Sequence, residues 1–212
     1  MNVVSAVHSA FAGLQAPLAD ELDPRNYREG YWALLDLFEA HVRLEDRPSM
    51  IAGATAVYGW MPRIFRKLRE YSRIMEPLEQ LRNASSGTEA LTFVQACPHP
   101  EILLRFVDGS VVGTSKFLHF LNPKAVPVWD SRVASNFGIG AAGVTRTDRF
   151  LDYWSGLSAC EADPPAAFRD FCRAPDGRDA PRLRLMEYAL FLNGKHDKQL
   201  RPRRAAKTPL VA

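Results

Sequence analysis

The chain has 212 residues, of which 47% are hydrophobic and 24% are charged, and its formal net charge at pH 7 is +3. This composition excludes a disordered protein and is sufficient to bury the core of one compact domain or of two packed helical lobes. The sequence has no apolar run of about 18 residues, and its N-terminus lacks the basic start and apolar stretch of a secretory signal. We therefore expect a soluble, cytoplasmic protein.

The chain has three cysteines, Cys97, Cys160 and Cys172, and no C-x-x-C pair. An odd number of cysteines without paired spacing favours neither a disulfide framework nor a structural zinc site. An iron–sulfur cluster requires more thiolates than the chain can supply. We predict buried free thiols and a protein without a metal or other cofactor.

Apolar residues recur at helical spacing along most of the chain, so the sequence predicts a mainly α fold. No alternating strand pattern and no internal repeat is present. Pro24 and Asn26 are the start signal of the first long helical segment. Loops rich in small residues are predicted at 83–87 and 138–143. The predicted helices cover residues 31–42, the segments on either side of the 83–87 loop, 101–107, 149–157, the segment after Pro164 and Pro165, and 182–191.

An aromatic and basic segment lies at residues 58–69. Tyr58 and Trp60 precede a predicted helix whose apolar residues Ile64, Phe65 and Leu68 would face inward. The other side of this helix would carry four cations, Arg63, Arg66, Lys67 and Arg69. Core aromatics beside a solvated basic face are the favoured interpretation, and a DNA-backbone face is the alternative.

Residues 114–137, TSKFLHFLNPKAVPVWDSRVASNF, are the most informative segment of the chain. Thr114 or Ser115 can cap an apolar helix, which would put Lys116 in its first turn, where the helix dipole favours loss of the lysine proton. An Asn-Pro pair ends this helix, and an extended Val-Pro-Val crossing follows. Asp130 can cap the next helix, which begins around Ser131. This arrangement can bring Lys116 and Asp130 to one place.

This segment resembles the helix-hairpin-helix DNA glycosylases, in particular the 8-oxoguanine glycosylase branch and bacterial proteins of that fold. Three features carry the resemblance: a glycine-containing hairpin at 107–113, the lysine-bearing helix after it, and an Ala-Val-Pro-Val-Trp-Asp turn into the next helix. The resemblance covers about residues 101–137, and residues 182–191 resemble the closing helix of the bacterial relatives. It implies a helix-hairpin-helix glycosylase-like domain over residues 1–194.

The resemblance implies a metal-independent DNA glycosylase that excises a damaged or modified base from double-stranded DNA, as in base-excision DNA repair. In the family, a lysine amine attacks the sugar C1′ after the base has been flipped out, and an aspartate stabilises the reacting sugar. These two roles carry over to Lys116 and Asp130. A Schiff base at Lys116 would add AP lyase activity by β-elimination. No membrane partner is implied.

The resemblance also implies contacts around this pair. Tyr58 and Trp60 are candidates for stacking on the flipped base. His119 is a candidate for lining the pocket, although a hydrogen-bonded place in the core is the favoured interpretation of this residue. Trp129, which could pack against the lysine stem, and Arg132 are further candidates for substrate binding, and Arg132 and Asp108 are candidates for support of the site. Gly109, Gly113, Thr114 and Ser115 are candidates for contacts to the DNA backbone.

Other interpretations of the same residues stay open. Taken alone, Lys116 can be a surface lysine, and Asp130 can be a helix cap paired with Arg132. A non-catalytic DNA-binding protein of the same fold and a helical protein-interaction module are therefore the alternative functions. The excised base is also open, among an oxidised purine, an alkylated base and a modified cytosine.

The positive charge is concentrated at the C-terminus, because residues 193–212 carry six Lys or Arg against one Asp. The segment 195–212 has two prolines and little apolar periodicity, so we predict a basic, disordered tail. A solvated terminus and a sequence-independent contact with phosphates are the two interpretations of this tail.

Overall fold

The structure is a computed structural model that describes residues 1–14, 27–60 and 64–199. These residues form twelve α-helices and no β-strand, which confirms the predicted mainly α class. Within the described ranges, no helix is both long and apolar enough to cross a membrane.

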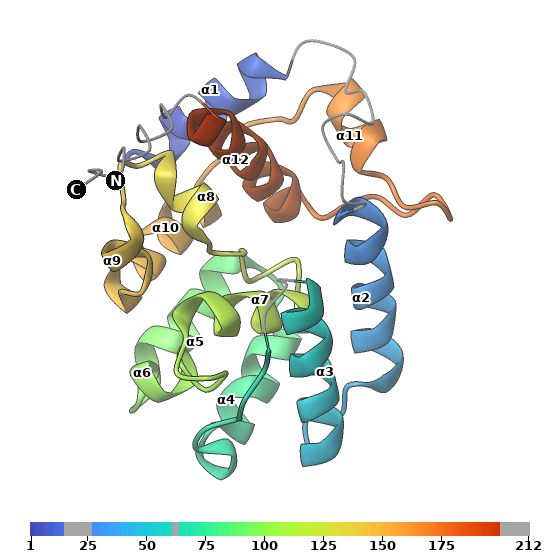
Figure 1. Ribbon diagram of the computed structural model, residues 1–212, viewed down its shortest axis with the longest axis vertical. Helices are drawn as coiled ribbons and strands as arrows, with labels where there is room; N and C mark the ends of the chain where they lie inside the picture. The colour runs from blue at the N-terminus through green and yellow to red at the C-terminus, as the bar shows by residue number, and fades with distance from the viewer. Residues whose placement is uncertain (15–26, 61–63, 200–212) are drawn as a thin grey trace, which may run out of the picture.

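The helices form two halves (Figure 1). One half contains α2 (Tyr27–His41), α3 (Arg47–Trp60), α4 (Tyr71–Asn83), α5 (Gly87–Ala96), α6 (Pro100–Leu103) and α7 (Val111–Leu121). The other half contains α1 (Val3–Gly13), α8 (Ser131–Ser135), α9 (Ala141–Val144), α10 (Thr147–Ser158), α11 (Ala166–Cys172) and α12 (Arg182–Gln199). Helix α10 also packs against α5 and thereby joins the two halves.

Helix α7 lies at the centre of the first half. It packs against α2, α3 and α4, and every residue from Gly113 to Phe120 is buried. Phe117 meets Phe38 and Phe106 edge-on, at ring-centroid distances of 5.0 and 5.3 Å. Each aromatic ring buried in this way contributes about 2–3 kcal/mol. A lysine or histidine on such a helix has to be buried with it.

The N-terminus of α7 lies earlier in the chain than predicted. Ser110 is the N-cap, and its hydroxyl accepts a hydrogen bond from the Gly113 amide at 3.1 Å. The prediction of Thr114 or Ser115 as the cap is therefore wrong. Lys116 lies in the second turn of α7, beyond the first turn to which the helix dipole effect is largely confined.

The segment that follows the second gap, residues 64–70, is not helical, so the predicted helix is wrong here. Leu68 forms an isolated antiparallel bridge with Val107. The Asp108 carboxylate accepts hydrogen bonds from the backbone amides of Arg66 and Lys67, at 3.1 and 2.7 Å. Bonds between segments about forty residues apart override the local helical periodicity, because the same amides cannot donate along a helix.

Most of the other helices lie near predicted positions, whereas α1 and α3 lie in segments for which no helix was predicted. Helices α2, α4, α5, α10, α11 and α12 match predicted segments, α6 is shorter than predicted, and α9 lies within the small-residue loop and its end. Helix α12 continues to Gln199. The start signal at Pro24 and Asn26, the cation Arg63 and residues 200–212 of the predicted tail lie outside the described residues.

No disulfide joins the three cysteines. Cys160 and Cys172 are buried, and Cys97 is partly buried. Cys160 and Cys172 belong to the apolar core, as expected for small hydrophobic side chains.

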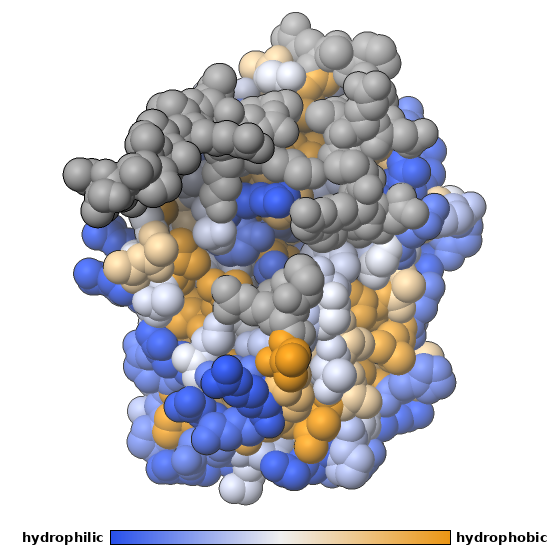
Figure 2. Space-filling view, viewed as in Figure 1, coloured by the Kyte–Doolittle hydropathy of each residue, from blue (hydrophilic) through white to orange (hydrophobic). Residues whose placement is uncertain are grey.

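The surface is mixed in hydropathy. Figure 2 shows hydrophilic residues over the lower end of the molecule, where α4 and α6 lie in Figure 1. Hydrophilic residues also show in the middle of this face, between the two halves. The junction of the two halves is thus a place where polar groups gather.

Asn122 connects the end of α7 to the end of α4. Its side-chain amide donates to the carbonyls of Leu81, Arg82 and Ala84, at 2.9, 3.2 and 2.8 Å. These carbonyls have no partner within α4 because they lie at its C-terminus. One buried side chain therefore satisfies the last turn of a neighbouring helix.

We expect Asn122→Ala to lower the free energy of unfolding by about 2–3 kcal/mol, because it leaves buried carbonyls without a donor. Urea denaturation followed by circular dichroism measures this loss. Asn83→Ala is the matched control, since Asn83 is exposed at the end of the same helix, and it should cost about 0.5 kcal/mol or less. Equal losses in the two variants would contradict the bridging role of Asn122.

Candidate functional site

The site is built around the turn that joins α7 to α8. Ser115, on α7, accepts a hydrogen bond from the Trp129 amide at 3.1 Å, and its hydroxyl lies 3.3 Å from the Trp129 carbonyl oxygen and 3.0 Å from that of Val112. Lys116 follows Ser115 in the chain, and Asp130 follows Trp129. The clamp between Ser115 and Trp129 thus sets the position of the lysine relative to the aspartate.

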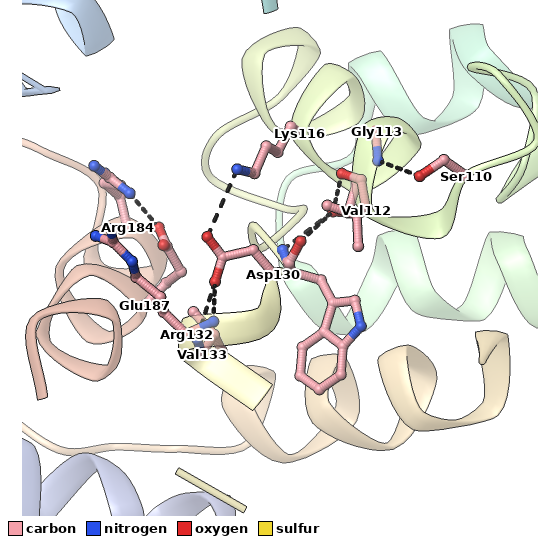
Figure 3. A network of polar contacts seen from close by, with 11 residues as sticks. Ser110, Val112, Gly113, Lys116, Asp130, Arg132, Val133, Arg184 and Glu187 are labelled. Carbon is pink, nitrogen blue, oxygen red and sulfur yellow. Dashed lines mark hydrogen bonds and ion pairs between the residues drawn. The ribbon is translucent and has the colours of Figure 1, made fainter. Parts of the chain in front are cut away.

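Lys116 and Asp130 form an ion pair in which the Lys116 Nζ lies 3.6 Å from the Asp130 Oδ2 (Figure 3). Their side chains are only 11% and 13% exposed. The sequence predicted that these two residues could meet, and the structure places them together. Lys116 is not a surface lysine, because α7 carries it into the core.

The two oxygens of Asp130 have different partners. Oδ1 accepts hydrogen bonds from the backbone amides of Arg132 and Val133, at 2.8 and 3.0 Å, which caps α8 as predicted. Oδ2 faces Lys116. One oxygen therefore fixes the fold locally while the other remains directed at the amine.

Trp60 contributes an aromatic face to the same place. The Lys116 Nζ lies 5.4 Å from the centroid of the Trp60 ring, within the range of a cation–π contact. Trp60 ends α3 and is partly buried, and its ring meets the Phe120 ring edge-on at 5.3 Å. An amine, a carboxylate and an indole ring, from three separate elements, therefore converge.

Tyr58 lies elsewhere. Its side chain is 5% exposed and meets the Phe65 ring at 5.8 Å. A Cβ added at Gly113 would lie 2.4 Å from the Tyr58 hydroxyl oxygen, so the tyrosine packs directly on the backbone of α7. Of the two aromatic residues predicted for base stacking, only Trp60 is at the site.

His119 is a core residue, which agrees with the favoured interpretation of the sequence. Its Nδ1–H donates to the Val126 carbonyl at 2.6 Å, and its Nε2 lies 3.2 Å from the Tyr31 hydroxyl. Burial lowers the pKa of His119 to about 3. The imidazole is therefore neutral at pH 7, and it lines no surface pocket because its side chain is fully buried.

The side chains of Trp129 and Arg132 also point away from the ion pair of Lys116 and Asp130. The Trp129 side chain is fully buried, donates from Nε1 to the Val144 carbonyl at 2.9 Å, and packs on the Tyr153 ring at 5.0 Å. The Arg132 guanidinium lies over the Phe191 ring at 4.6 Å. These side chains hold α8 and the turn in place, so their role here is to support the site, and neither side chain is directed at the ion pair as a substrate-binding group would be.

The hairpin residues have structural roles as well. Thr114 and Ser115 are fully buried, and the Thr114 hydroxyl accepts a hydrogen bond from the Val107 amide at 3.1 Å. The side chains predicted to touch a DNA backbone here thus face the core, as does Gly113. Gly109, partly exposed, has a φ of 71° and lies at the turn itself. A side chain at this glycine would meet the guanidinium of Arg69 at 2.6 Å.

Sequence reasoning missed a second buried ion pair, Arg184 with Glu187 on α12. Their side chains are 6% and 1% exposed. The pKa of Glu187 is raised to about 7, chiefly because the carboxyl group is buried. The attraction of Arg184 and of Lys116 lowers this pKa, and the nearby Asp130 carboxylate raises it. The sequence contains a pattern that indicates this pair, because a cation and an anion stand three positions apart within the apolar run 183–192 and therefore lie on one face of a helix.

The chemistry available at the site is that of an amine and a carboxylate. Across the described ranges, no group of three or more His, Cys, Asp or Glu side chains could hold a metal ion. A lysine amine is a nucleophile toward electrophilic carbon when it is unprotonated, and a carboxylate stabilises positive charge that develops nearby. The pair is therefore suited to attack on a sugar carbon or a carbonyl.

Comparison of the chain with protein-family models, with curated proteins and with solved structures gives no match.

The buried His119 should make the stability of the fold depend on pH in the acid range. A group whose pKa is lower in the folded state than its ordinary value of 6.5 stabilises the fold above pH 6.5, and this stabilisation is lost as the pH falls toward 3. Between pH 6.5 and 3, we expect the free energy of unfolding of the wild type to fall by on the order of 4 kcal/mol more than that of His119→Gln, because glutamine does not titrate.

Urea denaturation at a series of pH values between 6.5 and 3 measures how steeply the free energy of unfolding falls with pH in the wild type and in His119→Gln. His8→Gln is the matched control, because His8 is exposed on α1. This control should keep the wild-type slope. A wild-type slope in His119→Gln would show that the buried imidazole is not the group that titrates.

Proposed function

We propose that this protein is a DNA glycosylase of helix-hairpin-helix type that excises a damaged or modified base and then cleaves the strand as an AP lyase. One observation carries the proposal: the buried pair of Lys116 and Asp130, with 3.6 Å between Nζ and Oδ2, is formed by the turn on which the resemblance rests. The proposed partner is double-stranded DNA containing the altered base.

In the proposed reaction Lys116 acts as the nucleophile. Its neutral amine attacks the sugar C1′, the new C–N bond replaces the glycosidic bond, and the base leaves with the bonding electron pair and takes up a proton. Opening of the sugar ring then gives a Schiff base, and β-elimination breaks the bond to the 3′ phosphate. The lysine is returned by hydrolysis of the Schiff base.

Asp130 acts by its charge. The sugar becomes positively charged as the base departs, and an ionised carboxylate next to the attacking amine stabilises that charge. Since Oδ1 is already held by the two amides of α8, Oδ2 is fixed in direction before any ligand binds. Such preorganisation costs nothing at the moment of reaction.

Trp60 supplies the surface on which an extruded base can stack. Trp60 is partly exposed as a residue, and its ring centroid lies 5.4 Å from the Lys116 Nζ. Stacking on an aromatic ring accepts any base, so it gives binding without identifying the base. An oxidised purine, an alkylated base and a modified cytosine all remain candidate substrates.

A second candidate function, a non-catalytic DNA-binding protein of the same fold, is favoured by the ion pair itself. Asp130 attracts the ammonium form of Lys116, and the Trp60 ring does the same. A lysine that keeps its proton binds a phosphate and does not attack carbon. The following experiment separates the two functions.

The purified protein is incubated with duplex oligonucleotides that carry an abasic site or one of several modified bases, and borohydride is added. We expect a covalent adduct, visible on a denaturing gel, that maps to Lys116 by peptide mass spectrometry. Lys116→Ala should abolish the adduct. Asp130→Asn should reduce the rate of adduct formation about 10²–10³-fold, because it removes the charge and keeps a good N-cap.

Lys124→Ala is the matched control, since Lys124 is exposed in the turn between α7 and α8. This variant should form as much adduct as the wild type. An adduct that survives in Lys116→Ala would overturn the assignment of the nucleophile. No adduct on any substrate, combined with salt-dependent DNA binding by the wild type, would favour the non-catalytic function.

A further inference from the structure

Four charged side chains meet where the two halves of the molecule join, and we name Lys116, Asp130, Arg184 and Glu187 the buried charge cluster. All four have side chains that are at most 13% exposed. Figure 3 shows the Glu187 carboxylate between Arg184 and the ion pair of Lys116 and Asp130. The cluster has two cations and two carboxylates, so its formal charge is zero when all four are ionised.

Glu187 is held firmly in this place. It accepts a hydrogen bond from Arg184, whose guanidinium lies over the rings of Tyr31 and Tyr188, with its carbon 4.3 and 4.5 Å from their centroids. Two aromatic faces and one carboxylate thus fix the arginine. Glu187 cannot move without breaking this arrangement.

The docking of α12 on α8 sets the position of Glu187 relative to Asp130. The Asn136 side chain, next to α8, donates to the Leu190 carbonyl at 2.8 Å and accepts from the Asn193 side chain at 2.7 Å. A Cβ added at Gly194 would lie 2.1 Å from the Arg132 carbonyl oxygen, so the two backbones touch. Asp130 caps α8, and therefore the two carboxylates are carried by helices in direct contact.

The charge of Glu187 is adjustable near neutral pH, because burial raises its pKa to about 7. The other charged or titratable groups that face it or Arg184 belong to several elements. They are Lys116 and His119 of α7, Asp130 at the start of α8, Tyr153 of α10, Tyr31 of α2, and Arg184 and Tyr188 of α12. Burial leaves His119 neutral and raises the pKa of Tyr31 and of Tyr153, so these groups do not titrate near pH 7.

We propose that Glu187 is a positioning residue of the Lys116–Asp130 site, and that its charge sets how firmly the site holds Lys116 as an ammonium ion. This rests on the proposed function, in which the free amine of Lys116 reacts. When Glu187 is ionised, two carboxylates attract the ammonium. When Glu187 is protonated, one carboxylate remains, the net charge of the cluster is +1, and the free amine becomes more populated.

Trace labelling of amines with acetic anhydride tests this inference without DNA. Only unprotonated amines react, and peptide mass spectrometry gives the labelling of Lys116 relative to the exposed Lys124 in the same sample. At a fixed pH of about 8, where Glu187 of the wild type is mostly ionised, we expect relative labelling of Lys116 to be about 3- to 10-fold higher in Glu187→Gln. Asp152→Asn, at an exposed carboxylate on α10, should leave the ratio unchanged.

The wild type gives a second measurement that needs no variant. Between pH 5.5 and 8.5 the labelling of Lys116 relative to Lys124 should fall as the pH rises through about 7, where Glu187 loses its proton. A ratio that neither changes near this pH nor responds to Glu187→Gln in a folded variant would overturn the proposal. A purely structural role of Glu187 would alter stability without producing this pH dependence.

The outcome is independent of the proposed reaction. If the labelling of Lys116 responds to Glu187→Gln but borohydride traps no DNA adduct, the effect of Glu187 on Lys116 is supported and the glycosylase function is contradicted. If Lys116 forms the adduct but its labelling does not respond to Glu187→Gln, the glycosylase function is supported and the proposed role of Glu187 is contradicted. In an active enzyme, Glu187→Gln should also shift the pH profile of adduct formation toward lower pH.

Discussion

The burial of α7 is the constraint on which the rest of the structure depends. A helix enclosed by three others is expected to be apolar on every side, yet this one carries His119 and Lys116. A buried polar or charged group is tolerated only with a partner. The histidine has Val126 and Tyr31 as partners, and the lysine has Asp130. The chain must therefore return to α7 directly after leaving it, and the 122–130 turn makes this return.

The same constraint reaches the second half of the molecule. Asp130 belongs both to the turn and to α8, and α8 packs on α12, which carries the buried pair of Arg184 and Glu187. The two halves are consequently held together by charge as well as by the apolar contact of α10 with α5. Any ligand that changes the charge near Lys116 acts on elements from both halves at once, because the four side chains are buried, and charges interact more strongly in the interior of a protein than in water.

The features that the sequence could predict are those decided by neighbouring residues. Helical periodicity and the cap at Asp130 depend on residues within one turn, so both could be predicted. The non-helical course of 64–70 depends on Asp108, and the position of Glu187 relative to Asp130 depends on helix docking, and no local pattern in the sequence contains either. Trp60 and Trp129 are equally plausible from sequence, and only packing puts the first at the site and the second in the core.

The clamp between Ser115 and Trp129 fixes the number of residues that can separate Lys116 from Asp130 in the chain. A hydroxyl on α7 binds both backbone groups of one residue, so a single insertion or deletion within 122–128 would rotate a different residue into that position. Related sequences that keep this chemistry should therefore vary in length at the solvent-facing loops and keep the turn invariant in length. Among such sequences, the number of residues between Ser115 and Trp129 should be conserved more strictly than the residue types within the turn.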